Sequence, residues 1–354
     1  MRRPGYAAAV NHAVLAQVVR SGFVESVHHG SAVALAADGT QVLAAGDPEA
    51  AIMPRSSNKP LQVVGMLRAG LDLRGADLAL AAASHSGERY HLDGVRRLLA
   101  RAGLSPEVLQ NTPDLPLDPQ ERVAWQFAGR PASALAQNCS GKHAAMLLCC
   151  VENGWSIADY RDPAHPLQRH LADTVAELAG EPVAATGVDG CGAPVLALSL
   201  LGLARAFARV ATGSAQAPEG RTADAIRRHP EWLGGTGRGV TVLLRSVVGL
   251  IAKDGAESVY AAAMPDGRAV AVKIADGGER PVLPVVVALL RRLGWTRRAS
   301  TSCPGCRCSV TGSPSGTSKL SGFERKQPHE SGPGRKQSPE GVCRLPARPL
   351  DTWA

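Results

Sequence analysis

Two hairpin patterns, one near each end of the chain, constrain the fold more than any other feature of the sequence. Residues 31–46 form two apolar runs around an Asp38-Gly39 turn, and residues 258–274 form two more around Pro265-Asp266-Gly267. Apolar residues at helical spacing predict helices between and after these hairpins, at about 57–70, 92–103, 142–153, 164–180, 193–212 and 281–294. Strands at both chain ends with helices between them predict an α/β fold, in which one antiparallel sheet with flanking helices is closed by the two ends of the chain and accompanied by a helical region.

The composition changes abruptly at Arg297. Residues 1–296 carry the regular apolar patterns and are expected to form one domain, in which the proline-rich stretch 113–119 is a connecting loop. Residues 297–354 are rich in Ser, Gly, Pro, Lys and Arg without sustained periodicity, so we expect a disordered basic tail. The 354-residue chain has a net charge of +8, and a surplus of six positive charges lies in this tail. The remaining +2 gives no electrostatic reason to expect a specific nucleic-acid partner.

The sequence also bears on the compartment. The start of the chain is basic and then apolar, like a signal peptide, but Asn11 and His12 interrupt the apolar stretch. No apolar run approaches the ~18 residues that a membrane-spanning helix requires. Adjacent Cys149 and Cys150 lie in an apolar helical run and are expected to be core residues rather than a disulfide. We therefore expect a cytoplasmic protein without a membrane partner.

A Ser-x-x-Lys pair lies at the start of the first expected helix. Ser56 and Lys59 are three residues apart, so they share a helix face and the lysine amine can approach the serine hydroxyl. A serine becomes a good nucleophile when a base takes its proton, and a desolvated lysine near the positive end of a helix dipole suits that role. Alone the pair is a weak signal, because Ser56 is also a suitable helix cap.

Two polar segments follow this pair. Residues 84–88 read Ser-His-Ser-Gly-Glu, which is typical of a tight loop with exposed hydroxyl groups, or of a capped turn that begins the next helix. Residues 138–143 read Asn-Cys-Ser-Gly-Lys-His and place nucleophilic and cationic groups on a glycine turn before an apolar helix. The second segment lacks the spacing of a phosphate-binding loop, so nucleotide binding is not expected.

Two later segments add glycines, cysteines and a lysine. Residues 187–192 place three glycines around Asp189 and Cys191, which permits close approach of the backbone to a small molecule but also suits a plain turn between helices. Cys191 and Cys139 would suit a disulfide or a metal site, and the sequence leaves these alternatives open. Lys253 lies close to a glycine at the edge of a strand, like the Lys-Thr-Gly segment of serine acyl-transfer enzymes.

Taken in order, these segments resemble the rhizobial, thermolabile type of bacterial L-asparaginase (asparaginase II). The resemblance covers roughly residues 8–295, and five ordered motifs are far more specific than any one of them. The motifs are Arg55–Pro60, Ser84–Glu88, Asn138–His143, Gly187–Gly192 and Lys253–Glu257. The resemblance implies a fold of the serine β-lactamase and glutaminase-like group, and hydrolysis of L-asparagine to L-aspartate and ammonia.

The resemblance also implies which residues form the site. The catalytic residues would be two serine–lysine pairs, Ser56 with Lys59 and Ser84 with Lys253. The substrate-binding residues would be Arg55, Asn138, His143 and Asp189. Asp189 is expected to bind the α-amino group, because a zwitterionic amino acid needs one fixed carboxylate.

By the same resemblance, a zinc ion would be bound near the site by Cys139, Lys142 and Cys191, with no organic cofactor. Lysine is an unusual zinc ligand that must be neutral to bind, so the ion would lower its pKa strongly. We further expect a homodimer and a small-molecule substrate.

This sequence departs from the family pattern in three places. The cysteine expected after the Gly-Arg of the 234–239 loop is absent from Gly239-Val240-Thr241. Ser258 stands where a glycine is usual, and the segment that usually closes the chain is replaced by residues 297–354. The alternatives are therefore a glutaminase, a β-lactam-directed or other serine acyl hydrolase of the same fold, or a catalytically impaired homologue. In the last case the basic tail would bind RNA or anionic lipid.

Overall fold

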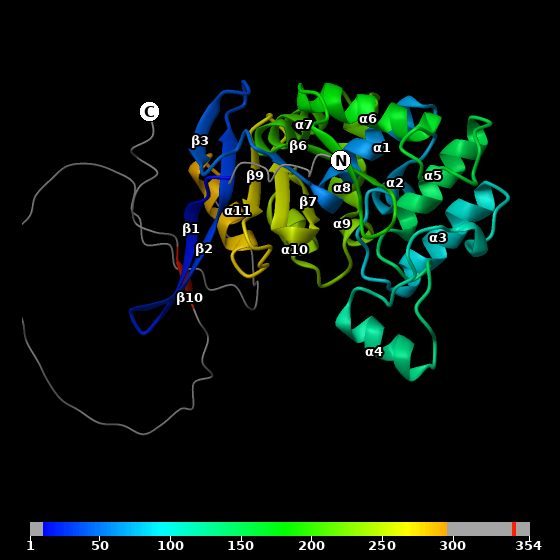
Figure 1. Ribbon diagram of the computed structural model, residues 1–354, viewed down its shortest axis with the longest axis horizontal. Coiled ribbons are helices and arrows are strands. Elements are labelled where there is room, and N and C mark those ends of the chain that lie inside the picture. Colours follow the sequence, from blue (N-terminus) through cyan, green and yellow to red (C-terminus); the bar gives the residue numbers. More distant parts are fainter. Residues whose placement is uncertain (1–9, 296–341, 345–354) are drawn as a thin grey trace, which may run out of the picture.

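The computed structural model describes residues 10–295 and the backbone of residues 342–344 (Figure 1). Their larger sheet is antiparallel and has the strand order β10-β1-β2-β9-β8-β7, with β3 also paired to β2. Its strands are β1 (Ala13–Arg20), β2 (Phe23–Leu35), β3 (Gln41–Ala45), β7 (Ile251–Gly255), β8 (Val259–Ala263), β9 (Ala269–Ile274) and β10 (Val342–Arg344). Because β2 pairs with β9, the early and late parts of the chain share one sheet, as predicted.

A smaller antiparallel sheet and the helices make up the rest. The small sheet has the order β4-β6-β5, with β4 (Ala51–Ile52), β5 (Ala185–Val188) and β6 (Pro194–Ser199). The α-helices are α1 (Lys59–Arg68), α2 (Gly75–Ala81), α3 (Arg89–Arg101), α4 (Pro119–Phe127), α5 (Ser140–Glu152), α6 (Pro166–Ala179), α7 (Leu200–Thr212), α8 (Pro218–Arg228), α9 (Pro230–Leu233), α10 (Gly239–Ser246) and α11 (Val282–Arg292). Three short 3-10 segments are η1 (Arg55–Asn58), η2 (Pro106–Val108) and η3 (Ala256–Ser258).

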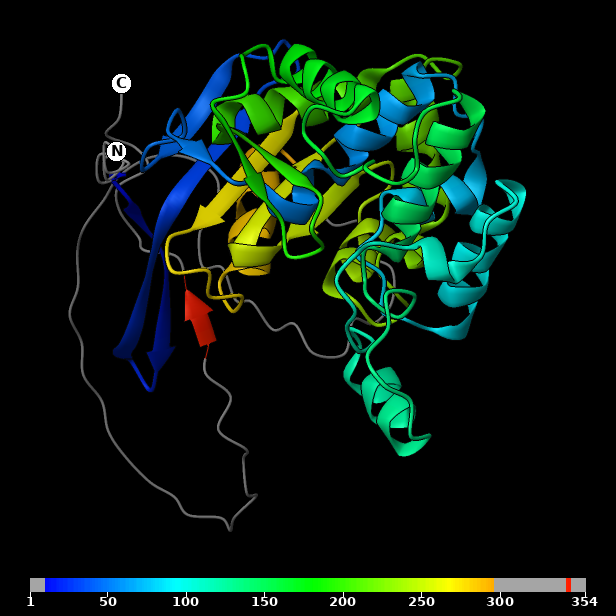
Figure 2. The same cartoon turned by 45° about the vertical axis from the view of Figure 1, so that its right-hand side comes forward.

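The larger sheet is covered on both faces at its centre. Nearly every residue of β9 is buried, and since successive strand residues point to opposite faces, both faces must be packed. Helices α7 and α11 both contact β9. Beside the sheet lies a helical region that includes α1, α2, α3, α5 and α6, and α4 projects from it (Figures 1 and 2). The free end of the β1–β2 hairpin also extends away from the body (Figure 2).

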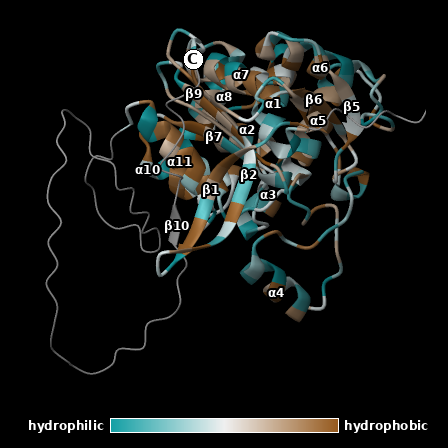
Figure 3. Ribbon diagram, turned by 60° about the vertical axis from the view of Figure 1, so that its left-hand side comes forward, coloured by the Kyte–Doolittle hydropathy of each residue, from teal (hydrophilic) through white to brown (hydrophobic). Residues whose placement is uncertain are grey.

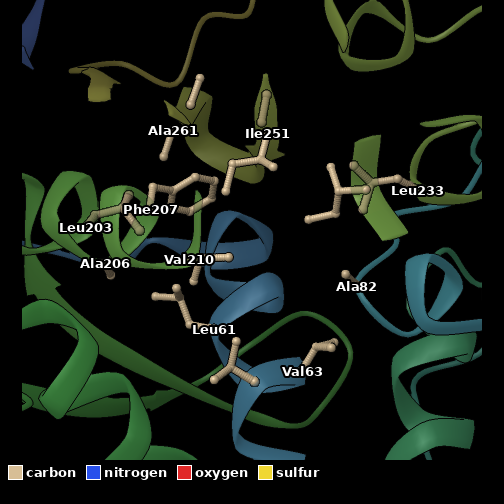
Figure 4. Packing of buried hydrophobic residues seen from close by; sticks show 14 of the residues in the cluster. Leu61, Val63, Ala82, Leu203, Ala206, Phe207, Val210, Leu233, Ile251 and Ala261 are labelled. Carbon is tan, nitrogen blue, oxygen red and sulfur yellow. The ribbon is translucent and has the colours of Figure 1, made fainter. Parts of the chain in front are cut away.

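One hydrophobic core joins the sheet to the helical region. Figure 4 shows Phe207 and Val210 of α7 between the sheet residues Ile251 and Ala261 and the α1 residue Leu61. All five side chains are fully buried. Strand β9 is largely hydrophobic (Figure 3), and β7 is apolar at Ile251 and Ala252. Because α1 packs into the same core as β7, the core fixes the helix that carries Lys59 relative to the strand that carries Lys253.

The architecture confirms the predicted fold class, a mixed α/β fold with an antiparallel sheet built from both chain ends. Both predicted hairpins are present, as β2–β3 and β8–β9. The predicted helices near 57–70, 92–103, 142–153, 164–180 and 281–294 correspond to α1, α3, α5, α6 and α11.

Two local predictions were wrong. Within the loop expected at 113–119, Pro119 instead begins helix α4, because Asp118 caps it by accepting hydrogen bonds from the N–H groups of Gln120 (2.8 Å) and Glu121 (3.1 Å). The helix expected over 193–212 begins only at α7, after strand β6, whose apolar side chains are buried between β4 and β5.

The segment after residue 296 is described only at β10. Its three residues pair antiparallel with β1, with Val18 opposite Cys343. The prediction of a disordered tail otherwise lies outside the described residues. Within residues 10–295, each helix is too short or too polar to cross a membrane.

Candidate active site

Three lysine side chains are buried in one part of the molecule. Lys59, Lys142 and Lys253 have exposed fractions of 1%, 2% and 0%, and they are among the largest fully buried side chains of the described residues. Lysine is rarely buried without a charged partner, because desolvation strongly disfavours the ammonium form. A group of buried amines is therefore a sign of a functional site.

The Lys59 amine has three hydrogen-bond acceptors. Its Nζ atom lies 2.6 Å from the backbone O of Ala83, 3.0 Å from Oγ of Ser84 and 3.1 Å from Sγ of Cys139. A lysine ammonium has three N–H donors, so this set uses all of them. The contact joins Lys59 to Ser84, whereas the resemblance pairs Lys59 with Ser56.

Ser56 lies in η1, immediately before α1. The Ser56 side chain is half-buried. The preceding residue, Arg55, has a φ of 51°, a left-handed conformation that side chains other than glycine rarely adopt. The Arg55 guanidinium forms a 2.7 Å ion pair with Oδ1 of Asp189. Strained backbone that is held by its surroundings is common at functional sites, so the strain at Arg55 favours a functional role for η1.

The Ser84 segment is fixed by backbone hydrogen bonds on two sides. The N–H of Ser84 donates to Leu233 O (3.1 Å), and the N–H of His85 donates to Asn138 O (3.0 Å). The His85 ring nitrogen Nε2 contacts Oγ of Ser140 at 2.8 Å, at the start of α5. These contacts tie residues 84–85 to the segment 138–140, which carries Cys139.

Cys139, Cys191 and Lys142 converge beside Lys59. The Lys142 amine lies 3.3 Å from Sγ of Cys191, and Cys191 and Cys139 are buried in one cluster. The neighbouring Cys139 side chain, with the positive charge of Lys142, lowers the pKa of Cys191, whereas the interaction with Cys191 and burial raise the pKa of Cys139. Burial lowers the pKa of Lys142, but Cys191 and Cys139 outweigh it and the net shift is upward. The three side chains therefore shift one another's pKa values strongly.

Asp189 supplies a fixed carboxylate between two cations. It lies in the turn between β5 and β6, where Gly192 donates its N–H to Asp189 O at 2.8 Å. Burial raises the pKa of Asp189, but the hydrogen bond from Arg55 and the charge of Lys142 outweigh this and lower it. A carboxylate that stays ionised here suits the predicted role of binding an α-amino group.

Lys253 is held by the residue that follows it. Its Nζ atom donates to the backbone O of Asp254 at 2.7 Å and also to the Asp254 side-chain oxygen Oδ1. Burial lowers the pKa of Lys253 to about 8, with Asp254 opposing and Lys59 adding to the shift. A lysine of this kind can release and accept a proton near neutral pH.

The remaining predicted substrate-binding residues also lie at this site. Asn138 Oδ1 accepts from the Cys139 thiol at 3.1 Å. His143 is fully buried, and its Nδ1 atom contacts the Tyr160 hydroxyl at 2.8 Å. Within the described part of the chain, its other ring nitrogen, Nε2, has no hydrogen-bond partner.

The residues expected to hold zinc have a suitable donor set. Zinc favours sulfur and nitrogen ligands, and here two cysteine sulfurs and the Lys142 nitrogen are buried together. Among the described residues, no group of three or more His, Cys, Asp or Glu side chains is arranged for a metal. A zinc site here would therefore depend on lysine as its third ligand.

Two residues that contact this site were not predicted from the sequence. Asp254 accepts the hydrogen bonds that Lys253 donates, and Arg238 forms a 2.6 Å ion pair with the second carboxylate oxygen of Asp254. Asp254 had a local signal, since it adjoins the predicted catalytic lysine. Arg238 had none, because only the tertiary structure brings it to Asp254.

Comparison with known proteins identifies a family. The profile of a protein family described as L-asparaginase II matches residues 16–305. The comparison with curated proteins found no match. Among solved structures, a beta-lactamase from Mycobacterium bovis is 18% identical with a TM-score of 0.40, over 75% of this chain and 94% of that one.

Two crystal structures of Mglu, one in its tris and glutamate form, are also similar. The tris and glutamate form is 15% identical with a TM-score of 0.33, over 78% of this chain and 63% of that one. The other is 14% identical with a TM-score of 0.33, over 80% and 71%. The family match spans most of the chain, whereas structural likenesses at these TM-scores carry no inference about function.

Proposed function

This chain belongs to the L-asparaginase II family, and we propose that it hydrolyses L-asparagine to L-aspartate and ammonia. Family membership supports an amidohydrolase with a small-molecule substrate. The observation that carries the proposal is the contact of 3.0 Å between the buried Lys59 amine and the Ser84 hydroxyl, beside the Arg55–Asp189 ion pair. A nucleophile with an adjacent amine, next to a paired cation and anion, suits amide hydrolysis of a zwitterion.

In the proposed reaction, Ser84 or Ser56 attacks the side-chain amide carbon of asparagine. A lysine amine accepts the hydroxyl proton and returns it to the leaving ammonia, which leaves an aspartyl ester on the serine. Water then hydrolyses this ester. The Lys59 amine lies within hydrogen-bond distance of Ser84. We take Lys253, whose pKa is lowered to about 8, as the base.

The substrate is positioned by its two charged ends. Arg55 would bind the α-carboxylate and Asp189 the α-amino group, which replaces their ion pair by two pairs with the substrate. His143 and Asn138 would contact the bound amino acid from the α5 side of the site. The Asp189 turn, with glycines on both sides, leaves room for a small substrate and favours asparagine over a β-lactam.

A competition assay tests the substrate assignment. Purified protein is given L-asparagine and L-glutamine together, and aspartate and glutamate are measured over time. One additional methylene is worth ~1–3 kcal/mol in a pocket, so we expect a preference for asparagine of about tenfold or more. Equal or faster release of glutamate would overturn the choice of substrate and favour the glutaminase alternative.

We also propose that zinc is bound by Cys139, Lys142 and Cys191. These residues would hold the ion in the pocket wall, where it would shape the substrate site. A chelator-free preparation analysed for metal should contain close to one zinc per chain, and the Cys139→Ser, Cys191→Ser double variant should lose it. Because two thiolates hold zinc tightly, less than about 0.1 zinc per chain would contradict the proposal.

A further inference from the structure

One carboxylate joins the buried Lys253 to an arginine on a neighbouring loop. Asp254 Oδ1 accepts a hydrogen bond from Lys253, and Asp254 Oδ2 lies 2.6 Å from Nη2 of Arg238. The side chains of Asp254 and Arg238 are each 25% exposed, whereas that of Lys253 is 0% exposed. The carboxylate thus lies between the buried amine and the partly solvated guanidinium.

The loop that carries Arg238 is attached to the Ser84 segment. We call residues 233–238 the bridging loop. Its Gly234 O accepts the N–H of Ser86 at 2.7 Å, and its Thr236 N–H donates to Oε2 of Glu88 at 3.0 Å. Gly235 has a φ of 139°, and a side chain there would collide with Oγ of Ser86. One side of the loop is therefore fixed against Ser84–Glu88, and its last residue is fixed against Asp254.

We propose that Asp254, paired with Arg238 of the bridging loop, is the positioning residue of Lys253, which it orients and whose protonation its charge governs. The inference deepens the proposed function, since it takes Lys253 as the base of the amidohydrolase. In this arrangement Asp254 aims the amine, and Arg238 both shares the carboxylate charge and joins the Lys253 strand to the Ser84 segment.

The charges around Lys253 predict that removing Asp254 and removing Arg238 shift the pKa of Lys253 in opposite directions. The charged or titratable groups that face the Lys253–Asp254 pair are Lys59 of α1, Tyr260 of β8 and Arg238. Arginines on the other elements that pack against β7 are engaged elsewhere: Arg55 with Asp189, Arg227 with Gly249 O and Arg245 with Glu231. Asp254 favours the ammonium form of Lys253, whereas Arg238 disfavours it. Removing the first should lower the pKa of Lys253, and removing the second should raise it.

The test compares Asp254→Asn and Arg238→Gln with the wild type in the pH dependence of kcat/KM. Because the neutral amine is the base, wild-type activity should rise as the pH increases through about 8. One neighbouring charge shifts a pKa by ~1–3 units, so we expect the rise to move by roughly one pH unit or more, downward in Asp254→Asn and upward in Arg238→Gln. Arg228→Gln, which removes an exposed ion pair with Asp224, should leave the profile unchanged. Shifts in the same direction, or no shift, would overturn the proposal.

A second readout separates this inference from the proposed function. Lysines labelled with carbon-13 at Cε are titrated by NMR in each variant, and the Lys253→Met variant identifies the Lys253 signal. Opposite shifts of that titration support the positioning role even if the protein fails to hydrolyse asparagine. If Asp254→Asn does not fold, Arg238→Gln decides alone: an upward shift supports the proposal, and an unchanged titration overturns it.

Discussion

Each of the three buried lysines at the site is compensated in a different way. Lys142 faces the Cys191 sulfur, and Lys253 faces the Asp254 carboxylate. Lys59 instead donates to two oxygens and a sulfur, with no carboxylate among the acceptors. Removing one partner of a buried charge leaves the other uncompensated, at a cost of ~3–5 kcal/mol. Burial lowers the pKa of Lys253 to about 8, and the Asp254 carboxylate opposes this shift.

Ser258 is a residue at which the sequence opposes the backbone conformation. It stands where family resemblance leads us to expect glycine, and its φ of 54° lies in the left-handed region. Its Oγ atom donates to Gly277 O at 2.8 Å. A left-handed conformation costs a serine ~1–2 kcal/mol, and a glycine avoids this cost. Glycine also has more conformational entropy in the unfolded chain, which reduces the resulting gain in stability by ~0.5–1 kcal/mol.

We therefore predict that Ser258→Gly is more stable than Ser258→Ala by about 1 kcal/mol. Both variants lose the hydroxyl hydrogen bond, so their difference isolates the backbone. Urea unfolding of the two proteins measures it. An alanine variant at least as stable as the glycine variant would show that the left-handed conformation at this residue carries no strain.

At the scale of elements, the contact between β7 and η1 brings Lys253 toward the Ser56 segment. Gly255 ends β7 so close to η1 that a side-chain carbon there would lie 2.6 Å from Pro54 O and 2.9 Å from the N atom of Ser57. Both atoms belong to the backbone and cannot move aside independently. The absence of a side chain at Gly255 is thus what permits the two elements to meet.

Gly255→Ala should displace β7 from η1 while the fold persists. A displacement near 1 Å at a catalytic site costs up to ~100-fold in rate, so we predict a fall in kcat approaching that size. Ala256→Ser adds one heavy atom at the exposed neighbouring residue and should retain wild-type kcat. Steady-state assays of both variants, with circular dichroism for folding, measure the effect. Equal kcat values for the two variants would contradict the role given to this contact.

The elements differ in how far the sequence could predict them. The two hairpins were predicted because a glycine turn and flanking apolar runs are local signals. Helix α4 was missed because it is short and begins within a proline-rich stretch, although Val123 and Phe127 follow helical spacing. Strand β6 was taken for helix because a short apolar run does not distinguish a buried strand from a buried helix, although Ser199 caps α7 by accepting the N–H of Gly202 at 2.8 Å.

For the site, motifs predicted the participants but not their contacts. The segments holding Ser56, Ser84, Cys139, Asp189 and Lys253 were each recognisable from local residue types. The Lys59–Ser84 contact and the Arg238–Asp254 ion pair were not, because residues 25 and 16 positions apart are brought together by packing alone. The catalytic and zinc-binding roles of these residues remain predictions.

At the scale of the whole molecule, the site depends on pairing between distant parts of the chain. Lys59 lies in α1, which follows the N-terminal strands, whereas Lys253 lies in β7. These early and late parts of the chain join in one sheet only when β2 pairs with β9. Any catalysis at this site therefore requires the complete α/β fold rather than one segment. The central claim for the whole protein is amide hydrolysis by a serine at this site.

The most direct test is ammonia release from L-asparagine by the purified full-length protein and three serine variants. We predict that the wild type releases ammonia and that Ser84→Ala or Ser56→Ala, or both, lowers kcat/KM by about a hundredfold or more. Ser57→Ala, which removes only a 2.6 Å hydrogen bond to Pro54 O, serves as the matched control and should remain active. Wild-type rates in both Ser56→Ala and Ser84→Ala would contradict the account.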